Sequence, residues 1–278
     1  MKFGIALGAL NPYFHLDATL VAEELGFESV WLPEHLVFTR SMSRSPHPGE
    51  DSPPVPPTAP IFDAFAYLAF LAARTERLRI GTHVFNIGLR HPFTTARGVQ
   101  TVDLLSEGRF EFGIGASWLE EEWDAAQLEF ATRGRRVDEA VAVCKRLWTE
   151  DTISHAGEFF AFEGVVFEPK PVQKPWPPIL VGGESRAALR RAARLGDGWI
   201  GMAHTLESAA SQIEALRGFL RECDRTADGF QIVLGGPVSS RVDVEHWEAL
   251  GVTRMIVSPW RRSPEAVDGL HRFADAIL

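Results

Sequence analysis

The sequence has few cysteines, a deficit of positive charge and no long apolar run. Only two cysteines occur among 278 residues. Cys144 and Cys223 lack the spacing of metal ligands, and we expect them to be free thiols of a reducing compartment. The formal net charge of −9 argues against a nucleic-acid or anionic-membrane partner. The apolar run at 5–10 is too short for a signal peptide or a membrane span. We therefore expect a cytoplasmic protein.

Several catalytic signatures are also missing. The nine histidines include no His-x-His or His-Glu-x-x-His pair, so no dedicated metal site is predicted. There is no Gly-x-Ser-x-Gly motif, which would indicate a hydrolase nucleophile on a strand-to-helix turn. No cysteine lies at the end of a predicted strand. Metal-dependent and nucleophilic chemistry are therefore disfavoured.

What the sequence does contain is a regular alternation of short apolar runs with helical patterns. Apolar residues make up 45% of the chain and charged residues 23%, as in ordinary globular proteins. Eight runs predict buried strands, nearly all followed by a helix: 3–7, 29–32, 78–84, 110–114, 179–181, 199–200, 230–234 and 254–257. This alternation predicts a (β/α)8 TIM barrel formed by residues 1–278 as a single domain. The alternative is a doubly wound open sheet, but its dinucleotide-binding version requires a Gly-x-Gly-x-x-Gly turn that the first strand lacks.

Two segments interrupt the alternation. Residues 33–60 form a long loop rich in proline and serine, and such loops are usually functional or mobile. We expect this loop to form part of a substrate wall or a lid. Residues 153–167 predict a hairpin with turns at Gly157-Glu158 and Glu163-Gly164, and a proline-rich linker follows at 169–178.

Glycine turns follow two of the predicted strands. Gly113-Ile114-Gly115 lies where a strand meets an acid-rich helix start, and Gly182-Gly183 precedes a helix that Ser185 could cap. Glycines let the backbone approach a ligand closely, and a helix N-terminus offers N–H groups to a phosphate. The alternative is that both are ordinary turns, with the glutamates at 120–122 interacting favourably with the helix dipole.

Polar residues follow two other strands. Glu34-His35 comes directly after the second strand, and a carboxylate beside a histidine can set its tautomer or assist proton transfer. His83 and Asn86 lie at the end of the third strand, where they could contact a ligand. The alternatives are a surface glutamate beside a loop-capping histidine, and a half-buried His83 whose ring bonds to the backbone.

A family resemblance runs through most of the chain. It is carried by these motifs: WLPEH at 31–35, TERLRIGT at 75–82, LSEGRF at 105–110, GIGASWLEEE at 113–122, RGRRVDE at 133–139, LWTE at 147–150, GEFF at 157–160, PKPVQ at 169–173 and AARLGDGW at 192–199. On these motifs the chain resembles the luciferase-like monooxygenase superfamily, and within it the coenzyme F420-dependent oxidoreductases. One departure is Trp118-Leu119, which stands where many deazaflavin binders carry asparagine.

The resemblance implies a bacterial-luciferase-like barrel that holds coenzyme F420, or alternatively FMN, at the carboxyl ends of its strands. The implied reaction is hydride transfer between the deazaflavin and a small organic substrate that the sequence does not identify. An FMN-dependent monooxygenase is the alternative, and a barrel that has lost catalysis and only binds is a further one. The family also suggests a homodimer.

The resemblance also assigns roles to particular residues. His35 is the first candidate for proton donor or acceptor, with Glu34 orienting it or touching the cofactor. His83-Val84 stands where family members often have a non-prolyl cis peptide against the reactive ring. Together with the polar and glycine positions noted above, the predicted cofactor-binding residues are His83, Val84, Asn86, Gly113, Gly115, Gly182, Gly183 and Ser185.

Overall fold

The computed structural model describes residues 1–8, 10–43, 45 and 52–278. Within these residues, eight parallel strands form a closed barrel: β1 (Lys2–Ala6), β2 (Ser29–Leu32), β3 (Arg79–Thr82), β5 (Phe110–Gly115), β8 (Ile179–Gly182), β9 (Gly198–Ala203), β10 (Gln231–Gly235) and β11 (Arg254–Val257). Each strand pairs with the next in this order, and β11 pairs with β1. The predicted (β/α)8 barrel is confirmed.

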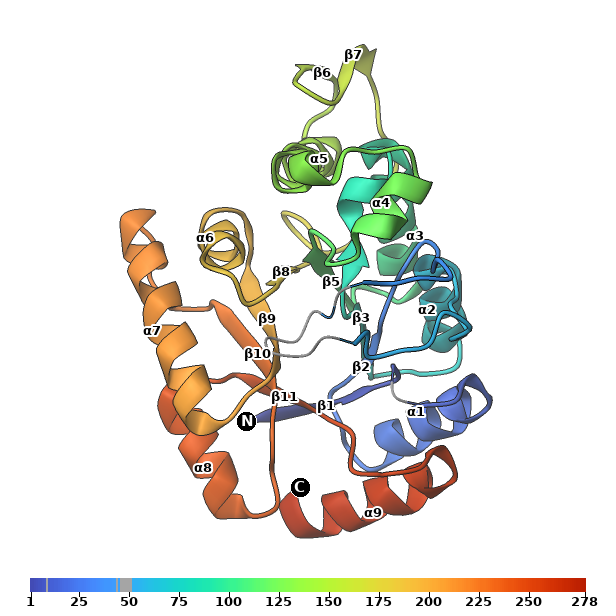
Figure 1. Ribbon diagram of the computed structural model, residues 1–278, viewed down its shortest axis with the longest axis vertical. Helices are drawn as coiled ribbons and strands as arrows, with labels where there is room; N and C mark the ends of the chain where they lie inside the picture. Colours follow the sequence, from blue (N-terminus) through green and yellow to red (C-terminus); the bar gives the residue numbers. More distant parts are fainter. Residues whose placement is uncertain (9, 44, 46–51) are drawn as a thin grey trace.

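Helices surround the strands (Figure 1). They are α1 (His15–Glu24), α2 (Ala64–Ala72), α3 (Pro92–Leu105), α4 (Glu120–Ala125), α5 (Arg133–Thr149), α6 (Arg186–Leu195), α7 (Leu206–Glu222), α8 (Arg241–Leu250) and α9 (Ala266–Ile277). Short 3-10 turns occur at Pro12–Phe14, Ile87–Leu89, Phe130–Thr132 and Ser263–Glu265. No helix in the described part of the chain is long and apolar enough to cross a membrane.

The local sequence explains where these helices lie. Helix α5 buries one apolar stripe, which includes Val137, Val141, Cys144 and Trp148, as its helical period requires. Side-chain oxygens cap the N-termini of α2, α6, α7 and α8, since the first N–H groups of a helix have no partner within it. Helix α8 ends at Gly251, whose φ of 92° suits glycine.

The predicted hairpin is present, but one of its predicted turns is wrong. Strands β6 (Ile153–Ala156) and β7 (Ala161–Val165) pair antiparallel and project beyond α5 (Figure 1). The turn at Gly157-Glu158 is confirmed by the Gly157 N–H bond to the Phe160 carbonyl, 2.9 Å. Glu163-Gly164 instead lies inside β7, where the register shifts and Gly164 has a φ of 63°. The glycine therefore allows the positive φ that this irregularity within the strand requires.

The third strand is shorter than the predicted 78–84. Strand β3 ends at Thr82, the chain passes through a cis peptide bond between His83 and Val84, and β4 (Phe85–Asn86) then pairs with β5. The expected cis bond is thus present. We call residues 83–84 the β3–β4 bulge.

The barrel interior contains a small apolar cluster separate from the main core between strands and helices. Trp31, Leu180, Ile200, Val233 and Ile256 form it, and Val84 packs against it. This inner cluster lies beneath the mouth, the end of the barrel where the strands finish. Below it, at the strand starts, the Arg254 guanidinium donates to the carboxylates of Glu28 and Glu111.

The long loop at 33–60 contains no helix or strand in its described residues. The expectation that it forms a wall or lid falls partly on residues 44 and 46–51, which lie outside the described residues. Its first part, residues 33–43, reaches the mouth directly after β2. That part carries the Glu34-His35 pair.

Candidate active site

His35 is held at the mouth by a carboxylate that the sequence did not reveal as its partner. Its Nδ1 lies 3.1 Å from Oε2 of Glu122, the third residue of α4. The Glu122 side chain is fully buried, whereas that of His35 is 15% exposed. An ionised carboxylate only accepts hydrogen bonds, so Nδ1 carries the hydrogen and Nε2 is the ring atom left for a ligand.

Glu122 also connects three segments around the mouth. Its Oε1 accepts from the backbone N–H groups of Leu36 and Val37. Its Oε2 accepts from Asn86 Nδ2 at 3.4 Å and Ser117 Oγ at 3.3 Å. The carboxylate therefore fixes both the loop that carries His35 and the strand end beside it. Sequence reasoning treated the acidic run at 120–122 as a helix-dipole feature, because nothing in it marks one member as buried.

Glu34 does not orient His35, contrary to one of its two predicted roles. Its carboxylate accepts from the backbone N–H of Asn86 at 2.9 Å and pairs with the guanidinium of Arg90. Burial raises the pKa of Glu34, Arg90 and the Asn86 N–H oppose that rise, and Glu122 adds to it. Glu34 and Glu122 therefore form two neighbouring carboxylate sites, and only Glu122 contacts the histidine.

The β3–β4 bulge forms another part of the mouth. His83 is half-buried, and desolvation lowers its pKa to about 4, although a hydrogen bond with the Gly201 backbone opposes this. The ring is therefore neutral at physiological pH. His83 meets Trp31 edge-on at 6.5 Å, and Val84 packs on the inner cluster.

Three of the predicted cofactor-binding glycines make room for the end of β3 and for this bulge. A Cβ at Gly113 would lie 1.9 Å from the Thr82 carbonyl oxygen. At Gly115 it would lie 2.6 Å from Val84 Cγ2, and at Gly182 2.9 Å from Val84 Cγ1. Such distances exclude a side chain without movement. Close packing therefore explains why glycine occupies these positions on β5 and β8. The sequence could not distinguish this explanation from contact with a ligand.

The remaining predicted residues separate into two places. Asn86 is 3% exposed. Its backbone N–H donates to the Glu34 carboxylate, and its side-chain Nδ2 donates to the Glu122 carboxylate. Gly183, with a φ of 111°, precedes α6, and Ser185 Oγ accepts from the Ala188 N–H at 3.2 Å. The structure therefore brings Asn86 to the His35 side of the mouth and places Gly183 and Ser185 at a helix N-terminus.

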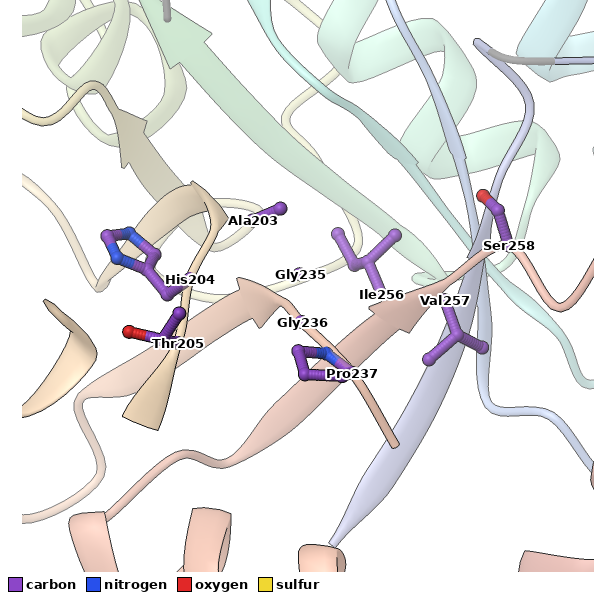
Figure 2. A pocket seen from close by; sticks show the side chains of 9 residues that line it. All are labelled: Ala203, His204, Thr205, Gly235, Gly236, Pro237, Ile256, Val257 and Ser258. Atoms are coloured by element: carbon purple, nitrogen blue, oxygen red, sulfur yellow. The ribbon is translucent and has the colours of Figure 1, made fainter. Parts of the chain in front are cut away.

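A pocket of about 490 Å³ lies at the ends of β9, β10 and β11 (Figure 2). Sequence reasoning missed it, because its lining residues are mostly small and carry no motif. They are Ala203, His204, Thr205, Gly235, Gly236, Pro237, Ile256, Val257 and Ser258. Ile256 also belongs to the inner cluster, so the pocket adjoins the apolar floor of the mouth. We call it the β9–β11 pocket.

Comparison with known proteins gives the family context of this site. An F420-dependent glucose-6-phosphate dehydrogenase of Microbacterium testaceum is 30% identical over 265 residues, covering 91% of this chain and 72% of its own. An FMNH2-dependent dimethylsulfone monooxygenase of Pseudomonas putida is 31% identical over 205 residues, covering 72% and 53%. The solved structure of an F420-dependent secondary alcohol dehydrogenase, in complex with an F420-acetone adduct, shares the fold. It has a TM-score of 0.80 at 16% identity, over 99% of this chain and 98% of that one.

The sequence pattern of one family covers nearly the whole barrel. That family is described as luciferase-like monooxygenase, and the match extends over residues 4–272, from β1 into α9. It includes His35, Glu122, the β3–β4 bulge and the strands that line the β9–β11 pocket. The barrel, its mouth and this match agree, and the chain belongs to the luciferase-like monooxygenase family.

Proposed function

We propose that this protein is an oxidoreductase that transfers a hydride between coenzyme F420 and a small organic substrate. The observation that carries the proposal is the His35–Glu122 pair, with Nδ1 held by a fully buried carboxylate and Nε2 facing no partner among the described residues. Such a pair is suited to general acid–base catalysis. The dehydrogenase of Microbacterium testaceum supports F420 as the coenzyme, since it matches 91% of this chain.

The proton chemistry follows from that geometry. When bound, the deazaflavin would supply the hydride acceptor or donor. For an alcohol substrate, His35 Nε2 takes the hydroxyl proton as the hydride leaves the same carbon, so that a carbonyl forms. The histidine then carries a positive charge, which the Glu122 carboxylate stabilises. In the reverse direction His35 returns the proton to the carbonyl oxygen.

The residues of the mouth suit a planar coenzyme with an anionic tail. Val84 and neutral His83 would contact the ring, because Val84 packs on the inner apolar cluster and His83 meets its Trp31 edge-on. The backbone at Gly182 and Gly183 and the first turn of α6, capped by Ser185, would hold the anionic part, since helix N-termini carry partial positive charge. We further propose that Gly113, Gly115 and Asn86 contribute by holding the bulge and the two carboxylates in place.

An FMN-dependent monooxygenase is the second candidate. The monooxygenase of Pseudomonas putida matches at 31% identity, and the His35–Glu122 pair could also serve reduced flavin and oxygen. The two functions differ in what is consumed. Oxygen uptake in the presence of reduced FMN would favour the monooxygenase, whereas F420 reduction without oxygen would favour the dehydrogenase. A homodimer remains our proposal for the assembly, and light scattering would test it.

Replacement of His35 tests the proposed mechanism. His35→Ala should lower turnover by about 100-fold or more, because general acid–base catalysis contributes about 10²–10⁴, and should change coenzyme affinity by less than about 3-fold. Steady-state kinetics and a fluorescence titration of the coenzyme measure the two effects. The control is His155→Ala in the β6–β7 hairpin, whose ring pairs with Glu139 away from the mouth. Unchanged turnover in His35→Ala would remove His35 from the mechanism.

A further inference from the structure

The side chains around the β9–β11 pocket are small and uncharged apart from one histidine. Ala203, Pro237, Ile256 and Val257 offer apolar atoms, and two glycines offer bare backbone. Its volume of about 490 Å³ falls within the range of small-molecule sites. Figure 2 shows His204 and Thr205 on one side and Ser258 on the other. Among the described residues, the lining includes no Lys, Arg, Asp or Glu.

The one titratable residue in the lining, His204, lies beside a carboxylate. Its Nδ1 lies 3.0 Å from Ser208 Oγ. Its Nε2 lies 3.0 Å from Glu184 Oε2, within ion-pair distance, although neither of these two buried atoms has a hydrogen-bond partner among the described residues. The other carboxylate oxygen of Glu184 accepts from the Met202 N–H at 2.7 Å. A positive charge on the His204 ring would therefore be balanced by Glu184 rather than by an anionic ligand.

Ser258 supplies an uncharged polar side chain. Its hydroxyl is exposed and has no hydrogen-bond partner among the described residues, whereas the Thr205 hydroxyl accepts from the Ser208 N–H in the cap of α7. A hydroxyl can donate to or accept from an uncharged ligand oxygen. It cannot neutralise an ionised phosphate or carboxylate, which needs cationic donors.

The nearest cationic side chains line a neighbouring pocket on the other side of Ser258. A second pocket of about 340 Å³ shares Ser258 with the first and is lined also by Arg261, Arg272 and Glu265. Both arginines are exposed, and Glu265 pairs with Arg262. Exposed arginines remain hydrated and are screened by salt, so they attract a ligand anion weakly. This second pocket is thus a distinct and competing location for a charged group.

We propose that the β9–β11 pocket receives the substrate, and that this substrate is uncharged and largely apolar, a neutral alcohol or its carbonyl product. The inference rests on the proposed hydride-transfer function and narrows it to a substrate class. A phosphate ester or carboxylate in the pocket would lose part of its hydration and would find no Lys or Arg among the lining residues. An apolar body would gain from contact with Ile256, Val257 and Pro237.

A matched pair of probes tests the substrate class. The probes are 2-hexanol and 5-hydroxyhexyl phosphate, which share a secondary alcohol and differ at the far end, with 1,5-hexanediol as the control for an added oxygen. We expect kcat/KM with F420 to be at least about 30-fold higher for 2-hexanol than for the ester, because the charged group loses part of its hydration without gaining a cationic partner. Ala203→Arg should reduce that ratio at least about tenfold, whereas Ala203→Gln, which adds a shorter, uncharged polar side chain, should leave it nearly unchanged.

A binding measurement separates this inference from the proposed function. Ligand-observed NMR on the protein without coenzyme compares the two probes directly, and tighter binding of 2-hexanol supports the inference whatever coenzyme is used. Equal or tighter binding of the ester, or no binding of 2-hexanol, overturns it. If Arg261→Gln with Arg272→Gln abolishes a preference for the ester, the second pocket holds the anion and the inference is also overturned. Failure of F420 to bind contradicts the proposed function instead.

Discussion

Glu122 is the residue on which the chemistry of the mouth depends. It is fully buried and receives hydrogen bonds from His35, two backbone N–H groups, Asn86 and Ser117. A buried carboxylate with this many donors is held rigidly. The orientation of His35, and the nitrogen that it presents to a substrate, are therefore set by a residue 87 positions away in the chain.

Replacing Glu122 tests that dependence. In Glu122→Gln one carboxylate oxygen becomes an NH2 group, which faces donors and cannot accept from all of them. We expect turnover to fall about 100-fold, because the preferred histidine tautomer is lost, while coenzyme affinity changes less than about 3-fold. Kinetics and a coenzyme titration measure these effects. The matched control is Glu139→Gln, which also removes a carboxylate that pairs with a histidine and accepts two backbone N–H groups. Equal losses in the two variants would contradict a specific role for Glu122.

His83 should make stability depend on pH. Its pKa is about 4 in the folded protein and 6.5 in the unfolded chain, so the unfolded state binds more protons between these values. Stability from this group is therefore present above about pH 6.5 and is lost as the pH falls toward 4, by about 2 kcal/mol at pH 5. Urea unfolding at pH 8 and pH 5 should show a smaller difference for His83→Gln than for the wild type. His246→Gln, at an exposed site, is the control, and an unchanged pH dependence in His83→Gln would show the assignment to be wrong.

At the scale of elements, the β3–β4 bulge and its two neighbouring strands form one packed unit. Strands β5 and β8 carry glycines where the bulge approaches, and Val84 occupies the space that their side chains would take. The shape of the mouth thus depends on small residues on β5 and β8 that face a larger residue, Val84, in the bulge after β3. The loss of stability from a larger side chain on one strand should therefore be reduced by a smaller side chain at the facing position.

A double-mutant cycle on Val84 and Gly115 tests this complementarity. Gly115→Ala puts a Cβ 2.6 Å from Val84 Cγ2 and should destabilise the protein by about 1–3 kcal/mol through overpacking. In the Val84→Ala background the same substitution should cost at least about 1 kcal/mol less, because the clashing methyl is gone. Denaturant unfolding of the four proteins measures the coupling. Strictly additive effects would mean that Gly115 is required for another reason.

The sequence predicts the elements well because their signals are local. Apolar runs and helix stops at Gly26 and Gly251 lie within a few residues of the structure they specify. The turn predicted at Glu163-Gly164 was wrong, since a glycine signals a left-handed residue without showing whether a turn or an irregular strand needs it. His35 was found from its position after a strand. Its partner was assigned to adjacent Glu34 instead of Glu122, because the relevant contact depends on how the segments that follow β2 and β5 come together at the mouth.

For the molecule as a whole, a buried ionic network at the opposite end of the barrel helps to close it. Arg254, 1% exposed, begins β11 and binds Glu28 before β2 and Glu111 on β5, and Arg79 on β3 also binds Glu111. Burial alone would lower the pKa of Arg254, but Glu111 and Glu28 outweigh it and raise the pKa. The last strand is thereby tied to the first half of the barrel.

Removal of this arginine should affect stability more than function. Arg254→Met removes the cation that pairs with the buried Glu111 and the half-buried Glu28, and it should cost about 3–5 kcal/mol of unfolding free energy. Coenzyme affinity should stay within about 2-fold, since the network lies at the starts of the strands. Denaturant unfolding and a coenzyme titration report the two quantities. Arg262→Met, which breaks an exposed pair with Glu265, should cost less than about 1 kcal/mol. A similar small cost for Arg254→Met would contradict the closing role.

The most direct test of the central claim is a parallel binding titration of the purified protein with oxidised F420 and with FMN, followed by fluorescence. The account predicts that F420 binds more tightly than FMN, and that His35→Ala retains this binding while losing turnover. Tighter binding of FMN would contradict the deazaflavin assignment and favour the monooxygenase. Binding of neither coenzyme would contradict the catalytic proposal itself.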